Sequence, residues 1–135
     1  MMVYLDTNVL IYAAIEQDKN KKERSIAYIQ TLAESNKLLL SPLVIQEYIY
    51  TLGRLGVDGD IIKYDVNFYS EYLCENYDAD MLISAMKKCI ANNACKSIKD
   101  VLHLEMAQKY AQKLVTFDGD FKKLQKYTTF DIEIL

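Results

Sequence analysis

Residues 3–12, "VYLDTNVLIY", combine two different hydrophobic periods in one short stretch. The first three are apolar-leaning residues of β type, whereas residues 7 to about 16 place apolar side chains at helical spacing. Asp6 lies at the junction between the two patterns. We therefore expect a short buried strand that passes directly into a helix, with a carboxylate at the carboxyl end of the strand.

The rest of the chain continues this alternation. Ser41 and Pro42 form a strong helix start, because Ser caps the first turn and Pro has its φ preset for the first helical position. A polar connection is expected over 16–23, and further strands over 38–41, 113–116 and 130–135. The further expected helices cover about 23–36, 42–53, 60–74, 79–92 and 100–112, with a turn and a short helix after 116. This order favours one α/β domain with a mostly parallel sheet of about four to five strands and helices on both faces.

The composition is typical of an ordinary folded domain. Of the 135 residues, 51% are hydrophobic and 26% are charged, which excludes a disordered or fibrous chain. The formal net charge of −3 gives no overall attraction to nucleic acid, so such binding would require local basic patches or bridging cations. The lysines within 19–22 and 122–126 are interpreted as solvated faces rather than as phosphate contacts.

The cysteines and the N-terminus indicate an intracellular setting. Cys74, Cys89 and Cys95 include no CxxC pair, so neither a disulfide framework nor a zinc site is indicated. The N-terminus lacks the pattern of a secretory signal, and no run of about 18 apolar residues occurs. We expect a cytoplasmic protein with no membrane association.

Four acidic residues are expected at one edge of the sheet. Asp6 ends the first strand, Asp118 follows a later strand, and Asp100 begins the helix that precedes that later strand. Glu47 lies in the helix that follows the second strand. Ligands of parallel α/β sheets bind at the carboxyl ends of the strands, so these four side chains could share one site.

Each acid also has a purely structural explanation. Asp6, Asp78 and Asp100 stand where free N–H groups and the helix dipole favour a carboxylate, an effect of roughly 0.5–2 kcal/mol. The sequence over 118–120, "DGD", is typical of a turn, and Glu47 flanks an apolar helical stripe. These explanations are adequate one by one, but together they require four coincidences at the same end of one sheet.

A cluster of carboxylates has a chemical requirement of its own. Like charges in a partly buried site persist only if protons or cations compensate them. Oxygen ligands without His or Cys suit hard cations such as Mg²⁺ or Mn²⁺. Such a cation holds a phosphate oxygen and lowers the pKa of a bound water, so an acidic pocket can act on a polyanion.

Four segments together resemble a known family: "VYLDTNVLIY", "SPLVIQEYIYTL", "IKDVLHLEMAQKYAQKLVTFDGDF" and the terminal "FDIEIL". They are similar to PIN-domain nucleases, and most of all to the VapC-type ribonuclease toxins of toxin-antitoxin pairs. The likeness covers nearly the whole chain and is weakest over about 56–96, where the family has helices but no motif. It implies a single PIN-like domain over residues 1–135.

The resemblance also implies a set of site residues. It assigns catalysis and divalent-metal binding to an acidic quartet, Asp6, Glu47, Asp100 and Asp118. Asp120 would be a secondary metal ligand, Thr7 and Asn8 would support Asp6, and Thr116 would line the site. The only histidine, His103, is interpreted as a packed or hydrogen-bonded residue outside the site.

What the resemblance implies about function is an Mg²⁺- or Mn²⁺-dependent endoribonuclease that hydrolyses RNA phosphodiester bonds by metal-activated water. Its expected substrates are structured RNAs such as tRNA or rRNA. A protein antitoxin and a homodimer are the expected partners.

Two other classes of function stay open at this point: a small-molecule phosphatase or phosphoacceptor domain, and a binding module without catalysis. A haloacid-dehalogenase-type phosphatase of another α/β fold also places Asp after its first strand, but it needs a second Asp at the position of Asn8. A response-regulator-type domain needs a late Lys at a strand end, which the sequence does not place. A catalytically inactive PIN-fold module for protein binding is the remaining alternative, and an incomplete acidic quartet would have favoured it.

Overall fold

The first strand passes straight into the first helix, as the sequence predicts. In the computed structural model, which describes residues 1–135, β1 covers Val3–Leu5 and α1 covers Thr7–Ala14. Asp6 has an extended backbone and is the N-cap of α1, where its side chain accepts a hydrogen bond from the backbone N–H of Thr7. One residue therefore ends the strand and begins the helix.

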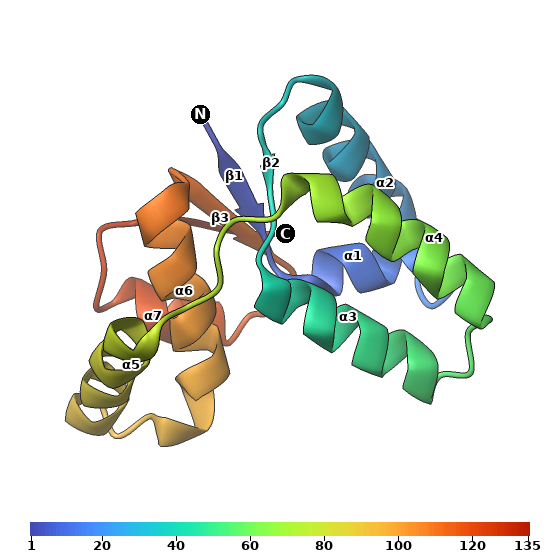
Figure 1. The fold of residues 1–135 in the computed structure, drawn as a ribbon. Coiled ribbons are helices and arrows are strands. Elements are labelled where there is room, and N and C mark those ends of the chain that lie inside the picture. Colours follow the sequence, from blue (N-terminus) through green and yellow to red (C-terminus); the bar gives the residue numbers. More distant parts are fainter.

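A four-stranded parallel sheet forms the centre of the molecule (Figure 1). The other strands are β2 (Leu38–Leu39), β3 (Lys113–Thr116) and β4 (Asp131–Ile134). Their order is β2-β1-β3-β4, and every neighbouring pair is parallel, so the expected sheet is confirmed. The register pairs Leu5 with Val115. The residues that follow them, Asp6 and Thr116, consequently lie side by side at the carboxyl edge of the sheet.

Helices cover the sheet from both sides. They are α2 (Lys19–Glu34), α3 (Pro42–Arg54), α4 (Gly59–Tyr69), α5 (Ala79–Ala91), α6 (Ile98–Tyr110) and α7 (Phe121–Gln125), with short 3₁₀ turns at Ser70–Tyr72 and Cys95–Ser97. Figure 1 shows α1 to α4 on one side of the strands and α5 to α7 on the other. None of these helices combines the length and the apolar character that a bilayer crossing requires.

The predicted connection over 16–23 is wrong for most of its length. The helix α2 already begins at Lys19, and the side chain of Asp18 caps it by accepting a hydrogen bond from the Lys21 N–H at 3.0 Å. Lys and Glu are good helix formers, so a solvated first turn needs no apolar residue to be helical. The polarity of this segment reflects its exposure and not a loop.

Two other helix boundaries differ from the prediction, the first of them for a tertiary reason. The predicted helix over 60–74 ends its α-helical part at Tyr69, because the chain then pairs with the end of β2. There the Leu40 N–H donates to the Tyr72 carbonyl at 2.9 Å, and the Cys74 N–H donates to the Leu40 carbonyl at 2.8 Å. The helix α6 begins at Ile98 instead of 100, so Asp100 lies inside its first turn.

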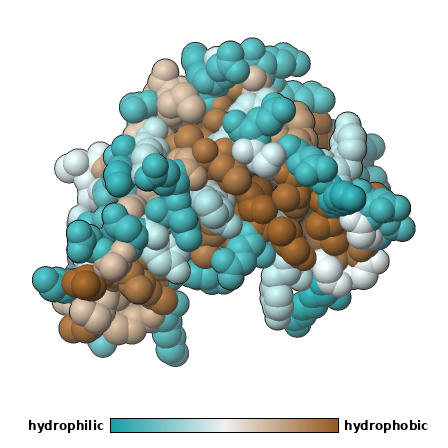
Figure 2. Space-filling view, in the orientation of Figure 1, coloured by the Kyte–Doolittle hydropathy of each residue, from teal (hydrophilic) through white to brown (hydrophobic).

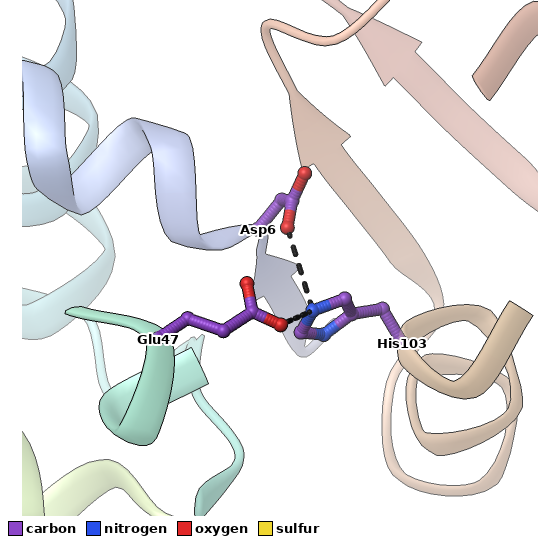
Figure 3. A group of neighbouring side chains, drawn as sticks. All are labelled: Asp6, Glu47 and His103. Carbon is purple, nitrogen blue, oxygen red and sulfur yellow. Dashed lines mark hydrogen bonds and ion pairs between the residues drawn. The ribbon is translucent and has the colours of Figure 1, made fainter. Parts of the chain in front are cut away.

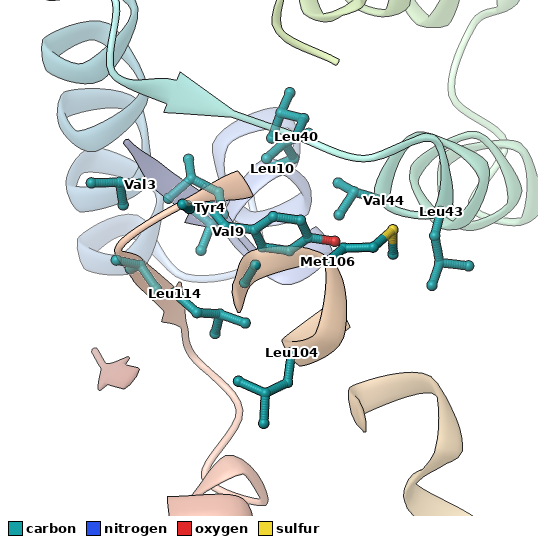
Figure 4. Close-up of a cluster of buried hydrophobic side chains, with 14 of the residues drawn as sticks. Val3, Tyr4, Val9, Leu10, Leu40, Leu43, Val44, Leu104, Met106 and Leu114 are labelled. Atoms are coloured by element: carbon teal, nitrogen blue, oxygen red, sulfur yellow. The ribbon is translucent and has the colours of Figure 1, made fainter. Parts of the chain in front are cut away.

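One hydrophobic core connects the two helix groups. It contains 28 buried apolar residues, so the whole chain shares a single cluster. Leu114 of β3, Val44 of α3 and Met106 of α6 are fully buried in it, together with Tyr4 of β1 (Figure 4). This packing fixes the positions of β1, β3, α3 and α6, the four elements that carry the predicted acids or immediately precede them.

Leu114→Ala tests the central place of β3 in this core. Removing three side-chain carbons that pack between the two helix groups should lower the free energy of unfolding by about 2–5 kcal/mol. Urea unfolding of both proteins measures the difference. The matched control is Ile61→Ala on α4, whose side chain is 54% exposed and whose loss should change stability by less than about 0.5 kcal/mol. Equal losses in the two variants would contradict a core centred on β3.

Candidate functional site

The predicted acidic quartet lines one cavity at the carboxyl edge of the sheet. This cavity of about 730 Å³ is bordered by Asp6, Glu47, Asp100 and Asp118, and also by Thr7 and Asn8. The four acids come from the end of β1, from α3, from the first turn of α6 and from the loop after β3. The structure thus brings together residues that are far apart in sequence, and we call this space the acidic cavity.

Asp6 is the most buried of the four acids, with only 6% of its surface exposed. Both of its carboxylate oxygens have donors. Oδ1 accepts from the Thr7 backbone N–H at 2.8 Å, and Oδ2 accepts from the Thr116 hydroxyl at 2.7 Å. The orientation of this carboxylate is therefore fixed by β3 as well as by its own helix.

Glu47 is held from two sides. Its Oε2 accepts from the Thr7 hydroxyl at 2.8 Å, and its Oε1 lies 2.9 Å from Nε2 of His103. Thr7 consequently supports two acids at once, Asp6 through its backbone N–H and Glu47 through its hydroxyl. The ammonium of Lys99 is more distant, at 4.0 Å from Glu47 Oε1.

The loop after β3 is tied to α1 through an amide side chain. Oδ1 of Asn8 accepts from the Phe117 N–H at 3.1 Å, and the Thr116 hydroxyl accepts from the Asp118 N–H at 2.9 Å. Asp118 in turn accepts from the backbone N–H of Asp120 at 2.8 Å. The side chain of Asp120 is exposed and does not line the acidic cavity, unlike the other predicted ligands.

His103, which the sequence interpretation left outside the site, belongs to it. Its ring is 1% exposed, and its Nε2 lies 2.9 Å from Glu47 and 3.8 Å from Asp6 (Figure 3). The expected hydrogen bond exists, but its partner is an acid of the quartet. The sequence contained a signal for this, because His103 follows Asp100 by three residues and therefore lies on the same face of α6.

A buried chain of hydrogen bonds leads from His103 into the core. Its Nδ1 lies 2.7 Å from the Tyr4 hydroxyl, which lies 2.6 Å from the Ser41 hydroxyl. Glu47 as a carboxylate can only accept, so Nε2 carries a hydrogen and donates it. When the ring is charged, Nδ1 also carries a hydrogen and donates it to the Tyr4 oxygen, and Tyr4 donates to Ser41. In the neutral ring both of these bonds run the other way, so every polar atom of the chain is paired in either state.

Burial, and for Asp100 also charge repulsion, shifts the pKa values of the acids. Burial raises the pKa of Asp6, although His103 and Thr116 oppose this shift. Burial and the neighbouring charges of Asp6 and Asp118 raise the pKa of Asp100 to about 6. The acidic cavity therefore holds more negative charge at neutral pH than its own surroundings compensate.

Glu47 and His103 behave as an ion pair inside this cavity. Burial alone would raise the pKa of Glu47, but the hydrogen bond and charge of His103 outweigh it and lower this pKa overall. Burial alone would lower the pKa of His103, but its bond to Glu47 and the charge of Asp6 raise it. The pair supplies one positive group for several carboxylates, and the remaining charge favours an added cation.

The donor set fits a hard divalent cation. Asp6, Glu47 and His103 each offer one ligand atom, and these atoms lie within 4.8 Å of one another. Because the Nε2 hydrogen of His103 is directed at Glu47, the carboxylate oxygens are the free donors, with those of Asp100 and Asp118 in the same cavity. Oxygen ligands of this kind are preferred by Mg²⁺ and Mn²⁺.

Comparison with protein families gives one match that covers most of the chain. The PIN domain family matches residues 3–127. A search of curated protein sequences gave no significant match.

Solved structures with the same fold match nearly the full length. A chain of VapBC2 from Rickettsia felis, bound to a promoter DNA fragment, has a TM-score of 0.70 at 17% identity, covering 100% of this chain and 99% of that chain. VapC20 from Mycobacterium tuberculosis, a toxin that cleaves the sarcin-ricin loop, has a TM-score of 0.69 at 18% identity and 90% and 94% coverage. FitAcB from Neisseria gonorrhoeae has a TM-score of 0.69 at 16% identity and 98% and 96% coverage. At these identities the likeness establishes the fold.

Tyr4→Phe tests the hydrogen-bonded chain behind the site. The change keeps the ring in the core but leaves the buried Nδ1 of His103 without a partner, so the free energy of unfolding should fall by about 1–3 kcal/mol. Chemical denaturation measures this loss. The control is Tyr64→Phe, at a tyrosine that is 76% exposed, and it should be close to neutral. A neutral Tyr4→Phe variant would show that the hydroxyl is not needed.

Asp100→Asn tests the cost of holding this carboxylate charged in the acidic cavity, where burial and the neighbouring acids both raise its pKa. The pKa of Asp100 is about 6 in the folded protein and 3.8 ordinarily, so the folded state binds more protons between these values. Stability therefore falls as pH rises through this window, and the isosteric amide removes that loss. In metal-free buffer the variant should gain stability over the wild type at about pH 7 but not at about pH 4. Asp131→Asn, at an exposed residue outside the cavity, is the control, and an equal gain at both pH values would contradict a raised pKa of Asp100.

Proposed function

Because this chain belongs to the PIN domain family, we propose that it is a divalent-metal-dependent endoribonuclease that hydrolyses RNA phosphodiester bonds. One observation carries this proposal: four acids from four parts of the chain line a single cavity at the carboxyl edge of the sheet. The fold shared with VapC20 and VapBC2 supports a role as the toxin of a toxin-antitoxin pair. In this proposal residues 1–135 act together as one PIN domain.

The residues that would hold Mg²⁺ or Mn²⁺ are Asp6, Glu47, Asp100 and Asp118, with Asp120 as a secondary ligand. When bound, such a cation supplies a bound water of lowered pKa and a charge that stabilises the phosphate oxygens. Asp6, Glu47, Asp100 and Asp118 line the cavity that the substrate would enter, whereas Asp120 lies outside this lining.

The protein's own contribution is to orient these acids before a substrate arrives. Thr7 and Thr116 hold Asp6, and Thr7 together with His103 holds Glu47. In this mechanism His103 is a positioning residue, because its donated hydrogen bond sets the direction of Glu47 and does not reach the substrate. Fixed carboxylates avoid the cost of ordering them during the reaction.

RNA is the proposed substrate, with tRNA or rRNA as the expected class. Lys96 and Lys99 line the acidic cavity beside the acids, so that a phosphate could contact ammonium groups as it approaches the carboxylates. VapC20, which shares the fold, cleaves the sarcin-ricin loop. The DNA in the VapBC2 structure is a promoter fragment and is not taken as a substrate.

Exposed apolar surface supports the proposed protein partners, a homodimer and an antitoxin. One exposed apolar stripe runs along α5 and consists of Leu82, Ile83, Met86 and Ile90. Figure 2 shows brown hydrophobic atoms at the lower left, where Figure 1 places α5. Apolar patches of this kind are typical of protein interfaces. The matched chains of VapBC2 and FitAcB share this fold over nearly their full length, and a cytoplasmic location is part of the same proposal.

The alternative functions have less support. An inactive binding module would not need four acids in one cavity, yet all four are present. A phosphatase would need a carboxylate at position 8, whereas the amide of Asn8 is engaged with the Phe117 N–H.

Asp6→Asn is the decisive variant for the proposed activity. The amide can still accept the Thr7 N–H, so the fold should survive, but one anionic ligand is lost. Cleavage of tRNA and rRNA in Mg²⁺ or Mn²⁺ should fall by at least about 100-fold. Gel analysis of RNA fragments, with EDTA as a second arm, measures the effect.

The matched control is Asp78→Asn, at the exposed N-cap of α5, because Asn caps helices as well as Asp does. Its cleavage should equal that of the wild type. Undiminished, EDTA-resistant cleavage by Asp6→Asn would remove the metal-nuclease assignment.

A further inference from the structure

A second cavity adjoins the acidic cavity and carries the opposite charge. It measures about 890 Å³ and is bordered by segments of α5, α6 and α7. Its lining includes four lysines, Lys88, Lys96, Lys123 and Lys126, and no Asp or Glu. In a chain with a net charge of −3, this is a local concentration of positive charge. We call it the lysine cavity.

Three of these four ammonium groups are available for a ligand. Lys88 is paired with Glu105 at 2.5 Å. Lys96, Lys123 and Lys126 have no carboxylate oxygen within 4.0 Å. Their charges are therefore uncompensated within the protein, and an anionic ligand would be attracted to them.

The rest of the lining suits a nucleotide better than a simple ion. The side chain of Tyr127 is 60% exposed at this cavity, which leaves its ring free to stack on a base. The side chains of Asn92 and Asn93 add amide groups that can donate and accept hydrogen bonds. Ammonium groups beside an aromatic ring and amides are the usual elements of single-strand recognition.

The lysine cavity adjoins the acidic cavity. Lys96 lines both of them, and it lies in the 3₁₀ turn Cys95–Ser97 directly before α6. Asp100 of the acidic cavity follows one helical turn later. A strand whose phosphate reaches the acids could therefore continue past Lys96 into the lysine cavity.

We propose that the lysine cavity binds the segment of RNA that flanks the cleaved phosphodiester. Lys96, Lys123 and Lys126 contact its phosphates, and Tyr127 stacks on one of its bases. This inference rests on the proposed function, because it takes RNA as the ligand. It also revises the interpretation of Lys123 and Lys126 as a merely solvated face. An acidic protein segment would match the charge of the lysines but has no base on which the exposed ring of Tyr127 could stack.

Binding measured without cleavage tests the lysines. In an Asp6→Asn background, a fluorescent single-stranded RNA of about 12 nucleotides is titrated at several salt concentrations. The double change Lys123→Gln and Lys126→Gln should weaken binding about 20-fold at about 0.1 M salt, and should reduce the slope of log K against log salt by about 1.4. The matched control is Lys37→Gln with Lys63→Gln, which removes the same charge from exposed positions outside both cavities.

The stacking role has its own variant. Tyr127→Ala should weaken RNA binding about fivefold or more while leaving the salt slope unchanged, and Tyr127→Phe should bind as the parent does. Tyr64→Ala, at a more exposed tyrosine on α4, is the control and should have no effect.

The outcomes separate this inference from the proposed function. If the lysine and control pairs bind RNA with equal affinity and equal salt slope, the inference is overturned, whether or not the wild type cleaves RNA. If the lysine pair loses affinity for a poly-glutamate peptide and not for RNA, the cavity belongs to a protein partner and the inference is again overturned. Loss of RNA binding in the lysine pair but not in the control pair supports the inference, and the cleavage assay with Asp6→Asn decides the proposed function separately.

Discussion

The geometry of the acidic cavity depends on one buried carboxylate at the junction of a strand and a helix. Asp6 ends β1, caps α1, and accepts a hydrogen bond from Thr116 of the neighbouring strand. A buried charge is costly unless it is paired and hydrogen-bonded, so the surroundings of Asp6 must be built around it. The hydrogen bonds from Thr7 and the nearby ring of His103 meet this requirement in part. The Asp6 carboxylate therefore places a negative charge at the carboxyl edge of the sheet.

The core and the acidic cavity are coupled through polar side chains. Tyr4 is an apolar core residue by position, yet its hydroxyl joins Ser41, the N-cap of α3, to His103. His103, on α6, then donates a hydrogen bond to Glu47, which lies on the helix α3 that Ser41 caps. The start of α3 and the direction of its acid are therefore fixed by one buried network. In such a network each group supports the geometry of the others, which keeps the carboxylates in place before any ligand binds.

The two cavities remove the objection that a protein with a negative net charge should repel the proposed RNA substrate. Negative charge is concentrated where a cation would bind, and positive charge is concentrated in the adjoining cavity that shares Lys96. The net charge of −3 averages over both regions and describes neither. Local arrangement, and not the total, decides which ligands such a surface attracts.

Local sequence patterns determined the strands, most helices and the edge at which Asp6 and Asp118 lie, because hydrophobic period and strand ends depend only on neighbouring residues. The sequence could not place the start of α2, because an exposed helical turn and a loop have the same polar composition. It also left His103 outside the site, since its partner Glu47 is 56 residues away. The lysine cavity likewise required α5, α6 and α7 to be packed together. The tertiary structure decided these features, because each is a contact between segments whose distance in space no local pattern records.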